Sequence, residues 1–496
     1  MAVIYAAPTT RVIDRNGGKN AWAFDLQSAI NRAEPGDVVQ LLPGRYHKAV
    51  SVRVEGHDGE PITIRGQEDG SAILDGGRER EQGRGSAEPM DDDFAFLSLV
   101  RTEHIVLEHI SIENCWPTGI YLRSVKDIVI RDCHCIGSRY FIYARQLTLA
   151  PTQRLLLERL SWVQDPDHDM WDGRVTWRDV KAKAGHFDAS FLNGAMFGSY
   201  DIEGQVVIRD CKIAHAFNAI RMDIRKSRVR DGNNGPEITR NKGVSIYGNS
   251  FAFIRDNAIE PEKGAQDWRV FNNHFFNVHA AFSLDGVALR ECYYVGNWLL
   301  NNRRPGLAKQ RNRSGKIFKF LAPPEYTDNM EPAPRSGLWS IFNSVQTRTS
   351  YAKQGRTSEW NDAYNAVGLY AADHPEEPGP PRALFFELTW NPRIQLRGLV
   401  TNDSQFPEKY VAEGGDVAGY RLIDTVFEIA DFEIDPSLPL GGWDGSLTKS
   451  AALEALASEE LVIERKDGGP LKIRAGLAPG AHDITDLGLT EWMEHW

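Results

Sequence analysis

GVSIYGNSFAFIRDNAIEPEKGAQ (Gly243 to Gln266), DWRVFNNHFFNVHAAFSLDGVALR (Asp267 to Arg290) and ECYYVGNWLL (Glu291 to Leu300) are successive copies of one sequence unit. Each full copy is about two dozen residues long and contains a short apolar strand, an Asn, a second short strand and a polar turn. A repeat of this length is typical of stacked coils rather than of a single globular sheet. The stretch therefore predicts a solenoid.

The same unit occurs upstream, which extends the solenoid toward the N-terminus. The copies are HIVLEHISIEN (104–114), DIVIRDCHCIG (127–137), RLLLERLSWVQ (154–164), QVVIRDCKIAH (205–215) and, with a looser fit, VTWRDVKAKAG (175–185). Together with the first three they make eight candidate coils. The alternation of apolar and polar residues within them predicts short strands with one buried face. We therefore expect an all-β fold.

Segments outside the repeats predict caps and long insertions. LQSAINRAEPGDVVQLLPGRY (Leu26 to Tyr46) predicts an amphipathic helix followed by a strand, and a helix there would cover the open end of the solenoid. AVSVRV, PITIRG and SAILDGG predict three further short strands. We expect a solenoid over 1–435 with a cap helix at about 26–34, long loops at 225–242 and 303–381, and a C-terminal cap or appendage at 436–496.

The net charge of −11 over 496 residues argues against a general nucleic-acid binder. An anionic substrate would need a local basic patch or a bridging cation. No apolar run is long enough to span a membrane, and the first ten residues are too short and too weakly basic for an intact signal peptide. We therefore expect a protein that binds neither membranes nor nucleic acids.

The five cysteines do not predict a disulfide framework, because their number is odd and no metal-type pair spacing occurs. Cys133 and Cys211 occupy the place in their repeats that Asn249, Asn273 and Asn297 occupy in later ones. We interpret these residues as the rungs of one inward-facing ladder.

The coil pattern resembles the right-handed parallel β-helix of the pectate-lyase-like superfamily. The opening AINRAEPGDVVQLLPGRYHKAVSVRV…PITIRG…AILDGG is similar to the first coils of the polysaccharide-lyase branch that includes alginate lyases and chondroitinase B, and to alginate C5-epimerases. DPDHD (165–169) resembles the epimerase DPHD motif with an extra Asp, whereas the NTDG…DD set of polygalacturonases is absent. The resemblance implies a polysaccharide or oligosaccharide substrate, a secreted or periplasmic location and a monomeric solenoid.

Stacking the second strands of the repeats places their outward residues in columns, because side chains alternate along each strand. The inward pairs Ile120/Leu122, Ile142/Ala144, Ile220/Met222, Ile259/Pro261 and Phe282/Leu284 set the alignment. One outward column is then Tyr121, Tyr143, Arg221, Glu260 and Ser283, and the next is Arg123, Arg145, Asp223, Glu262 and Asp285. A third contains Pro117, Arg139, Phe217, Asp256 and His279, with Asp167 and His186 added from two irregular coils.

Three stacked carboxylates, Asp223, Glu262 and Asp285, repel one another and need compensation. A Ca²⁺ ion bound by all three, a neighbouring Arg221 or Arg255, or a proton retained at neutral pH would each provide it. In a polysaccharide lyase, which the sequence favours, cations neutralise a uronate carboxylate and Arg221 or His186 removes the C5 proton. In a glycoside hydrolase, two of the carboxylates act as acid and base. Glu260 joins the catalytic candidates in either case.

The remaining outward residues suit substrate contacts, since aromatic faces stack on sugar rings and Arg binds carboxylates. The candidates are Tyr121, Tyr143, Arg123, Arg145, Arg139, Asp256, His279, Trp171 and Asp167. Each residue alone equally fits a solvated surface in which acids and Arg pair across coils. An epimerase and a non-catalytic carbohydrate-binding solenoid therefore stay open beside the lyase and the hydrolase.

Overall fold

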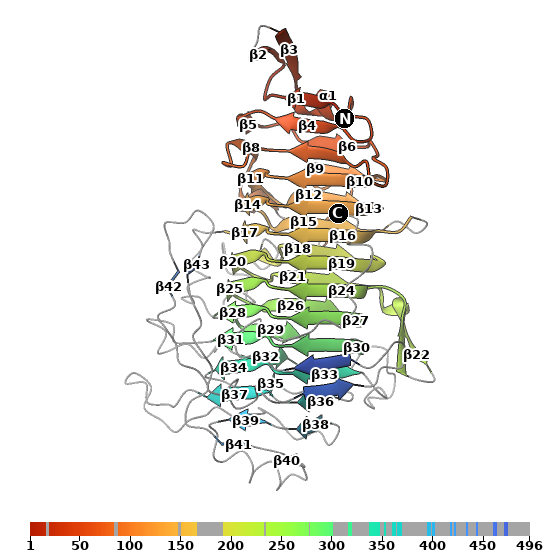
Figure 1. Ribbon diagram of the computed structural model, residues 1–496, viewed down its shortest axis with the longest axis vertical. Coiled ribbons are helices and arrows are strands. Elements are labelled where there is room, and N and C mark those ends of the chain that lie inside the picture. Colours follow the sequence, from red (N-terminus) through yellow and green to blue (C-terminus); the bar gives the residue numbers. More distant parts are fainter. Residues whose placement is uncertain are drawn as a thin grey trace.

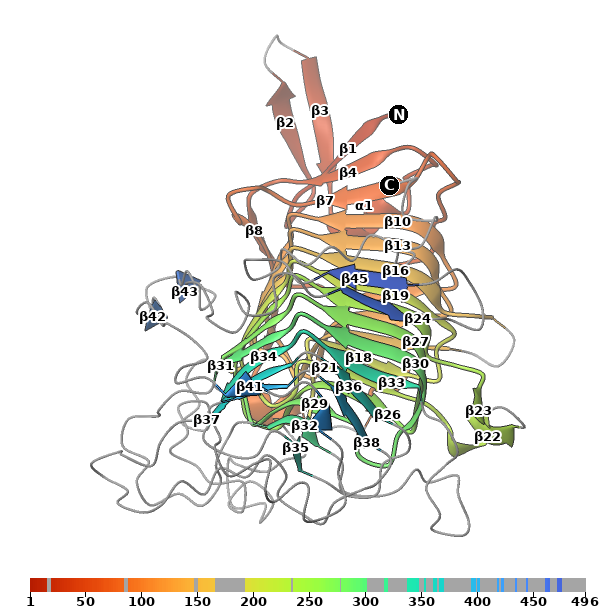
Figure 2. The same ribbon diagram turned by 60° about the horizontal axis from the view of Figure 1, so that its bottom comes forward.

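The computed structural model is a right-handed parallel β-helix whose coils stack along its long axis (Figure 1). Each coil contributes one strand to each of three sheets, A, B and C, which can be followed as separate walls when the molecule is tilted so that its lower end comes forward (Figure 2). The structure describes residues 1–15, 19–83, 88–146, 150–165, 192–232, 235–276, 278–300, 316–319, 337–347, 352–353, 360–363, 365–369, 394–397 and 399–401, and short strands between 417 and 474.

Sheets A, B and C are entirely parallel over the coils. Sheet A contains β1 (Val3–Ala6), β4 (Val38–Leu41), β7 (Ile62–Arg65), β10 (Glu103–Glu108), β13 (Lys126–Arg131), β16 (Gln153–Glu158), β19 (Gly204–Arg209), β24 (Lys242–Tyr247), β27 (Gly264–Phe271), β30 (Ala288–Val295), β33 (Leu338–Ile341), β36 (Trp360–Ala363), β38 (Ile394–Arg397) and β40 (Val417–Ala418). Sheet B contains β5 (Gly44–Tyr46), β8 (Ala72–Arg78), β11 (Ser111–Cys115), β14 (His134–Ile136), β17 (Ser161–Val163), β20 (Lys212–Ala216), β25 (Ser250–Ile254), β28 (His274–Phe276), β31 (Trp298–Leu300), β34 (Ser344–Thr347), β37 (Ala366–Leu369), β39 (Val400–Thr401) and β41 (Arg421–Leu422). Sheet C contains β6 (Val50–Val52), β9 (Ala95–Val100), β12 (Thr118–Arg123), β15 (Tyr140–Arg145), β18 (Phe197–Tyr200), β21 (Ile220–Asp223), β26 (Asn257–Glu262), β29 (Ala280–Ser283), β32 (Lys316–Lys319) and β35 (Ala352–Lys353).

The core is a stack of inward side chains, one layer for each coil. In sheet C the inward column is fully buried and consists of Leu97, Ile120, Ile142, Phe197, Ile220, Ile259, Phe282 and Phe318. Burial of each such side chain contributes about 1.5–3 kcal/mol. The inward alignment predicted from the sequence is confirmed, so the opposite, outward positions of these strands are also fixed.

The corner between sheets A and B carries the predicted ladder. Residues just before it adopt left-handed backbone angles, as at Asp210 (φ 56°) and Asn272 (φ 53°), which turn the chain from one sheet to the next. The side chains of Asn249, Asn273, Asn297 and Asn343 then each donate from Nδ2 to Oδ1 of the next rung at 3.0 Å, and Asn365 accepts the last of these bonds. Cys133 and Cys211 take the same turn position, and the Cys211 amide donates to Asn249 Oδ1 at 2.9 Å.

The N-terminal end is capped by α1 (Leu26–Ile30), which packs its buried Leu26, Ala29 and Ile30 against the first coils. Asp25 is its N-cap and accepts a hydrogen bond from the Ser28 amide at 3.1 Å. The helix is shorter than the predicted 26–34. Beyond it, β2 (Arg11–Arg15) and β3 (Lys19–Phe24) form an antiparallel hairpin. A 3-10 turn, η1 (Arg80–Gly83), follows β8. No helix within the described ranges has the length and apolar character needed to cross a membrane.

The predicted long loops contain strands of their own. The 225–242 insertion forms η3 (Lys226–Arg228) and an antiparallel hairpin of β22 (Val229–Gly232) and β23 (Gly235–Ile238), and its Arg225 and Arg228 pair with Asp201. Strands β32 to β37 lie inside the predicted 303–381 loop and continue the coils. In the C-terminal segment, β42 (Glu433–Ile434) pairs with β43 (Trp443–Asp444), and β44 (Glu460–Ile463) pairs with β45 (Leu471–Arg474).

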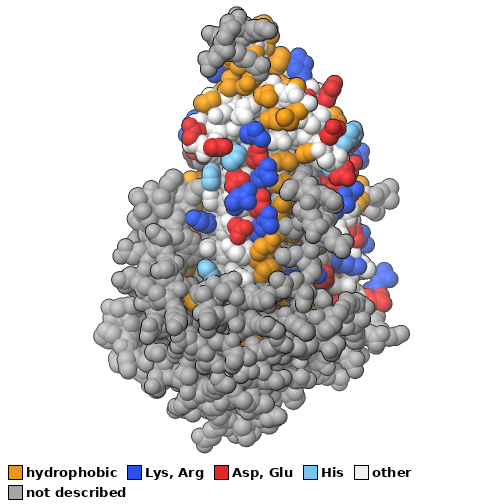
Figure 3. Space-filling view, in the orientation of Figure 1, with side chains coloured by type: hydrophobic (Ala, Val, Ile, Leu, Met, Phe, Trp, Pro, Cys, Tyr) orange, Lys and Arg blue, Asp and Glu red, His pale blue; other side chains and the backbone are white. Residues whose placement is uncertain are grey.

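The outer face of sheet A pairs its own charges across coils. Arg65 and Arg131 both bind Glu108, and Glu158 binds Arg209 at 2.5 Å. Basic and acidic side chains therefore alternate down the described part of this face (Figure 3). Because the charges compensate one another locally, this column fits a structural role of the kind expected for paired surface charges.

Candidate active site

The outer face of sheet C brings together the two columns predicted from the sequence. In one column, Tyr121, Tyr143, Gly198, Arg221 and Glu260 lie in register on consecutive coils. In the other, the register runs Arg123, Arg145, Tyr200, Asp223 and Glu262. The predicted register is confirmed for β12, β15, β21 and β26, but the prediction missed the coil of β18. Gly198 and Tyr200 therefore separate the aromatic and basic strip from the acids.

Arg221 links two acids of the following coil. Its Nε and Nη2 donate to Glu262 Oε1 at 3.0 and 2.9 Å, and Nε lies 3.7 Å from Glu260 Oε2. The other carboxylate oxygen of Glu260 accepts from Asn257 Nδ2 at 2.8 Å. These charge-assisted hydrogen bonds fix the two acids in place and supply one positive charge for both.

Asp223 lies beside Arg221 on the same strand and has two partners. The Nζ of Lys263 donates to Asp223 Oδ1. Glu88, from the segment that precedes β9, interacts with Asp223, whose charge and side-chain hydrogen bonding both raise the pKa of Glu88. A hydrogen bond between two carboxyl groups requires that one of them carry a proton. Glu88 and Asp223 are therefore a pair of interacting acids in which protonation of Glu88 is favoured, flanked by the cations Arg221 and Lys263.

Burial and mutual repulsion favour protonation of three of these acids. The pKa of Glu88 rises from 4.5 to about 7, first through burial and then through the charge of Asp223. Burial also raises the pKa of Asp223, against the opposing effect of Lys263. The pKa of Glu260 rises from 4.5 to about 8 through burial and the neighbouring charge of Glu262. Burial and neighbouring charge thus favour the protonated forms of these carboxyl groups, which is one of the three alternatives left open by the sequence.

Glu88 and Lys263 were not among the residues predicted from the sequence. Glu88 lies in a polar segment outside the repeat, so column stacking could not place it. Lys263 directly follows the strand that carries Glu262 and has a left-handed φ of 69°. The strand alternation therefore no longer applies at Lys263. The adjacent carboxylates were the one signal that a cation was needed there.

Asp285 does not continue the acid column, which corrects the sequence prediction. Strand β29 ends at Ser283, and the Val287 amide donates to the Leu284 carbonyl at 3.4 Å. This turn includes Gly286, which has a φ of 71°. Asp285 therefore sits in a turn after the strand rather than in register with Asp223 and Glu262. The alignment extended the strand alternation past Ser283, and although Leu284 does pack in the core, the chain turns at Asp285.

The tyrosine strip is covered rather than exposed. Tyr121 and Tyr143 are only 5% and 2% exposed, and their rings are parallel with centroids 6.4 Å apart. The segment after Glu88 lies against them, since Asp91 accepts a hydrogen bond from Tyr121 OH at 2.7 Å and pairs with Arg123. Arg145 Nη1 donates to the carbonyl of the same segment's Pro89 at 3.2 Å. These rings therefore offer no open face for a sugar in this conformation.

The third predicted column lies at the corner between sheets B and C. Arg139 is 2% exposed, donates to Asn193 O at 3.1 Å and lies over the Tyr140 ring. Asp256 is buried, and its negative charge contributes to the raised pKa of Glu260. His279 lies one coil further on, and its amide donates to Ile254 O at 3.0 Å. Asp167, Trp171 and His186 lie outside the described residues.

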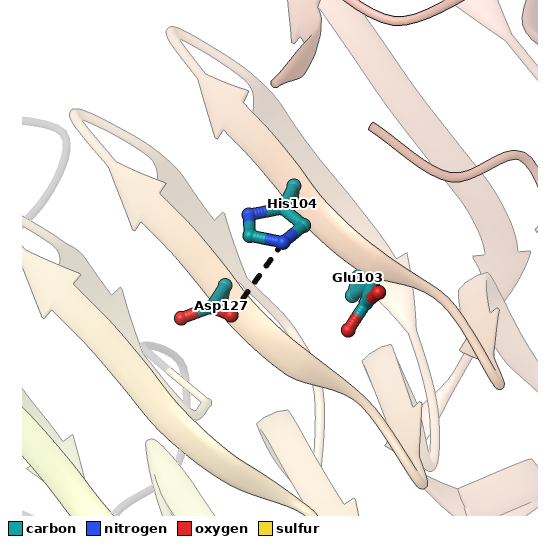
Figure 4. Close-up of side chains that lie close together, drawn as sticks. All are labelled: Glu103, His104 and Asp127. Carbon is teal, nitrogen blue, oxygen red and sulfur yellow. Dashed lines mark ion pairs between the residues drawn. The ribbon is translucent and has the colours of Figure 1, made fainter. Parts of the chain in front are cut away.

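Two groups of acids were tested as metal sites. The predicted calcium ligands Asp223 and Glu262 are bound to Lys263 and Arg221, so these donors do not fit a further cation. On the opposite wall, Glu103, His104 and Asp127 lie close together on β10 and β13 (Figure 4). There Asp127 already pairs with Arg154 and, at 3.8 Å, with Lys126. In both groups, Lys or Arg side chains therefore already pair with acids that a metal ion would need as ligands.

No protein-family model matches the chain, and no curated protein sequence matches it significantly. Several solved structures are similar in fold. A mannuronic acid specific polysaccharide family 6 lyase from human gut microbiota has 10% identity and a TM-score of 0.45, with 85% of this chain and 83% of that chain covered. A GH136 lacto-N-biosidase from Eubacterium ramulus has 11% identity and a TM-score of 0.45, with 85% of this chain and 68% of that chain covered. The PL6 family alginate lyase AlyGC has 10% identity and a TM-score of 0.44, with 82% of this chain and 53% of that chain covered. This chain thus spans about half the length of AlyGC.

Proposed function

We propose that this protein is a carbohydrate-active enzyme that cleaves glycosidic bonds of a polysaccharide or oligosaccharide on the outer face of sheet C. The observation that carries the proposal is the interacting pair of Glu88 and Asp223, set between Arg221 and Lys263. A carboxyl group with a pKa of about 7 can both hold and release a proton at neutral pH, which is the property of a general acid. Simple structural ion pairs do not require such a group.

Glu88 is the proton donor in this proposal, and it protonates the oxygen of the departing sugar. Asp223 keeps the proton on Glu88 through its negative charge, and Lys263 limits how far Asp223 itself becomes protonated. Glu262 supplies the second carboxylate. It lies in register with Asp223 on the next coil and is oriented by two hydrogen bonds from Arg221.

Hydrolysis is the cleavage reaction that the charges support best. The cations of the two columns already have partners: Arg221 binds Glu262, Arg123 binds Asp91, and Arg145 binds the Pro89 carbonyl. Lys263, next to the second column, binds Asp223. A uronate carboxylate would have to displace one of these groups before a cation could neutralise it. A paired acid and carboxylate need no such displacement to act on a glycosidic bond.

Elimination on a uronate is the second candidate, and one observation favours it. The charges of Arg145 and Arg221 both act on Glu88, so two guanidinium groups lie near the proton-bearing carboxyl. If substrate binding displaced the segment that carries Pro89, Arg145 would gain a hydrogen-bond donor for a carboxylate. The polysaccharide lyase favoured by the sequence analysis therefore remains the alternative proposal, without calcium at Asp223 and Glu262.

The proposal is tested by incubating the protein with a panel of neutral and uronate-containing glycans, each with and without a chelator of divalent cations. New reducing ends without ultraviolet absorbance identify hydrolysis. Reducing ends with the absorbance of an unsaturated uronate identify elimination. Activity should survive chelation, because Lys263 and Arg221 hold the acids that calcium would need. Absence of new reducing ends across a broad panel would refute the proposal and leave the epimerase or the binding solenoid.

A further inference from the structure

Tyr143 carries a buried hydroxyl group for which the described residues provide no hydrogen-bond partner. The side chain is 2% exposed, although its position on β15 faces outward from sheet C. Buried tyrosine hydroxyls normally have a hydrogen-bond partner, because a buried polar group without one costs about 1–3 kcal/mol. Its neighbour Tyr121 follows that rule and donates to Asp91. With no partner among the described residues, the buried Tyr143 hydroxyl lowers the stability of the folded protein.

The missing side chain of Gly198 sets the position of the Tyr143 ring. Gly198 is the next residue in the column, between Tyr143 and Arg221. A Cβ atom added at Gly198 would lie 2.5 Å from Tyr140 Cε1 and 2.8 Å from Tyr143 Cδ2. The Tyr140 and Tyr143 rings, packed edge to face with centroids 4.9 Å apart, thus occupy the space that any other residue would fill. Tyr143 consequently leans over the coil of β18 toward the acids.

Charged groups of the candidate site surround this hydroxyl. The charges of Glu88, Arg145 and Arg221 all act on it. Burial, which is the largest influence, and the neighbouring Tyr140 raise its pKa, so the hydroxyl keeps its proton at neutral pH. A neutral hydroxyl in this position can donate a hydrogen bond, and two guanidinium groups nearby favour an acceptor that carries negative charge.

We propose that, once substrate binding displaces Pro89 to Asp91 from above the ring, the Tyr143 hydroxyl donates a hydrogen bond to the substrate oxygen that gains negative charge as the glycosidic bond breaks, with Arg145 and Arg221 adding positive charge beside it. This inference rests on the proposed function and makes Tyr143 a catalytic residue beside Glu88. Gly198 is then a positioning residue, because it acts only by leaving room for the ring. No proton is transferred from Tyr143, and the donor of the proton remains Glu88.

The test compares Tyr143→Phe with the wild type on the panel glycan that the wild type cleaves fastest. Loss of a hydrogen bond made only in the transition state should lower kcat about 100-fold and change KM less than about threefold. The thermal midpoint should stay the same or rise, because the variant removes a buried hydroxyl for which the described residues provide no partner. Tyr247→Phe, on the outer face of sheet A, is the matched control and should retain full activity.

Gly198→Ala provides a second variant that removes no functional group. It should lower kcat at least about tenfold by displacing the Tyr143 ring, while the acids keep their contacts. A Tyr143→Phe kcat within about threefold of the wild type would overturn the inference. So would an increase in KM with an unchanged kcat. If the wild type cleaves no glycan, the proposed function fails together with this inference, whereas an active wild type with an unaffected Tyr143→Phe variant removes the inference alone.

Discussion

Replacing Glu88 by Gln should make the protein more stable at alkaline pH while it removes activity. The folded protein holds the Glu88 proton more tightly than an unfolded chain does, because its pKa rises from 4.5 to about 7. Stability from this group is therefore fully present below about pH 4.5 and is lost as the pH rises to about 7. At about 1.4 kcal/mol for each pH unit, the loss is at most about 3 kcal/mol. Solvent screening of this partly buried group lowers it to about 1–2 kcal/mol. Glu88→Gln keeps a hydrogen-bond donor for Asp223 and does not ionise, so it escapes the loss.

Urea denaturation followed by tryptophan fluorescence, at about pH 5 and about pH 8, measures this effect. The variant should gain about 1–2 kcal/mol over the wild type at the higher pH relative to the lower one. Asp92→Asn removes an exposed carboxylate of the same segment and should show no such gain. Equal pH dependence in the wild type and Glu88→Gln would refute the argument that burial and Asp223 hold a proton on Glu88.

Two further predictions concern the corner ladder and the pH dependence of turnover. Asn297→Ala removes two hydrogen bonds donated to Val270 O and Asn343 Oδ1 and two accepted from Asn273, so thermal or urea denaturation should show a loss of about 3–5 kcal/mol; a loss below about 1 kcal/mol would contradict the ladder's role. The rate of glycan cleavage should fall as the pH rises through about 7, because the pair of Glu88 and Asp223, which faces Arg221, Arg145 and Lys263, then loses its proton; a rate that stays constant from about pH 6 to about pH 9 would contradict this assignment.

The sequence predicts the fold well because equivalent positions of the repeat have the same environment in every coil. Once one position is assigned as inward or outward, the equivalent positions of the other coils follow. The inward column of sheet C, the columns that contain Arg221 and Glu262, and the ladder shared by Cys211 and Asn249 all follow from one alignment. Each coil repeats the same alternation, so errors do not accumulate along the chain. The coil that contains β18 was missed because its strand reads FGSY, with glycine at the outward position that defines the column.

The active-site prediction was less complete, because it depends on segments that leave the repeat. Glu88 reaches Asp223 from a segment that precedes β9 by sequence and covers later coils, a contact that no periodicity encodes. Asp285 falls in a turn because strand β29 ends at Ser283. Gly286, with its left-handed φ, belongs to the same turn. The burial of Tyr121 and Tyr143 has the same origin, since the segment from Pro89 to Asp91 lies over them. Composition and spacing located the face on which Arg221 meets the acids, but not the segment that covers part of this face.

The most direct test of the central claim is the turnover number of Glu88→Gln compared with that of Asp92→Asn on the same glycan. If Glu88 is the proton donor of a glycan-cleaving site, Glu88→Gln should lose about 100-fold to 10,000-fold in kcat, and Asp92→Asn should match the wild type. Circular dichroism of both variants should be unchanged. A Glu88→Gln variant that is folded and cleaves glycan at the wild-type rate would contradict the assignment of catalysis to the carboxyl pair on sheet C.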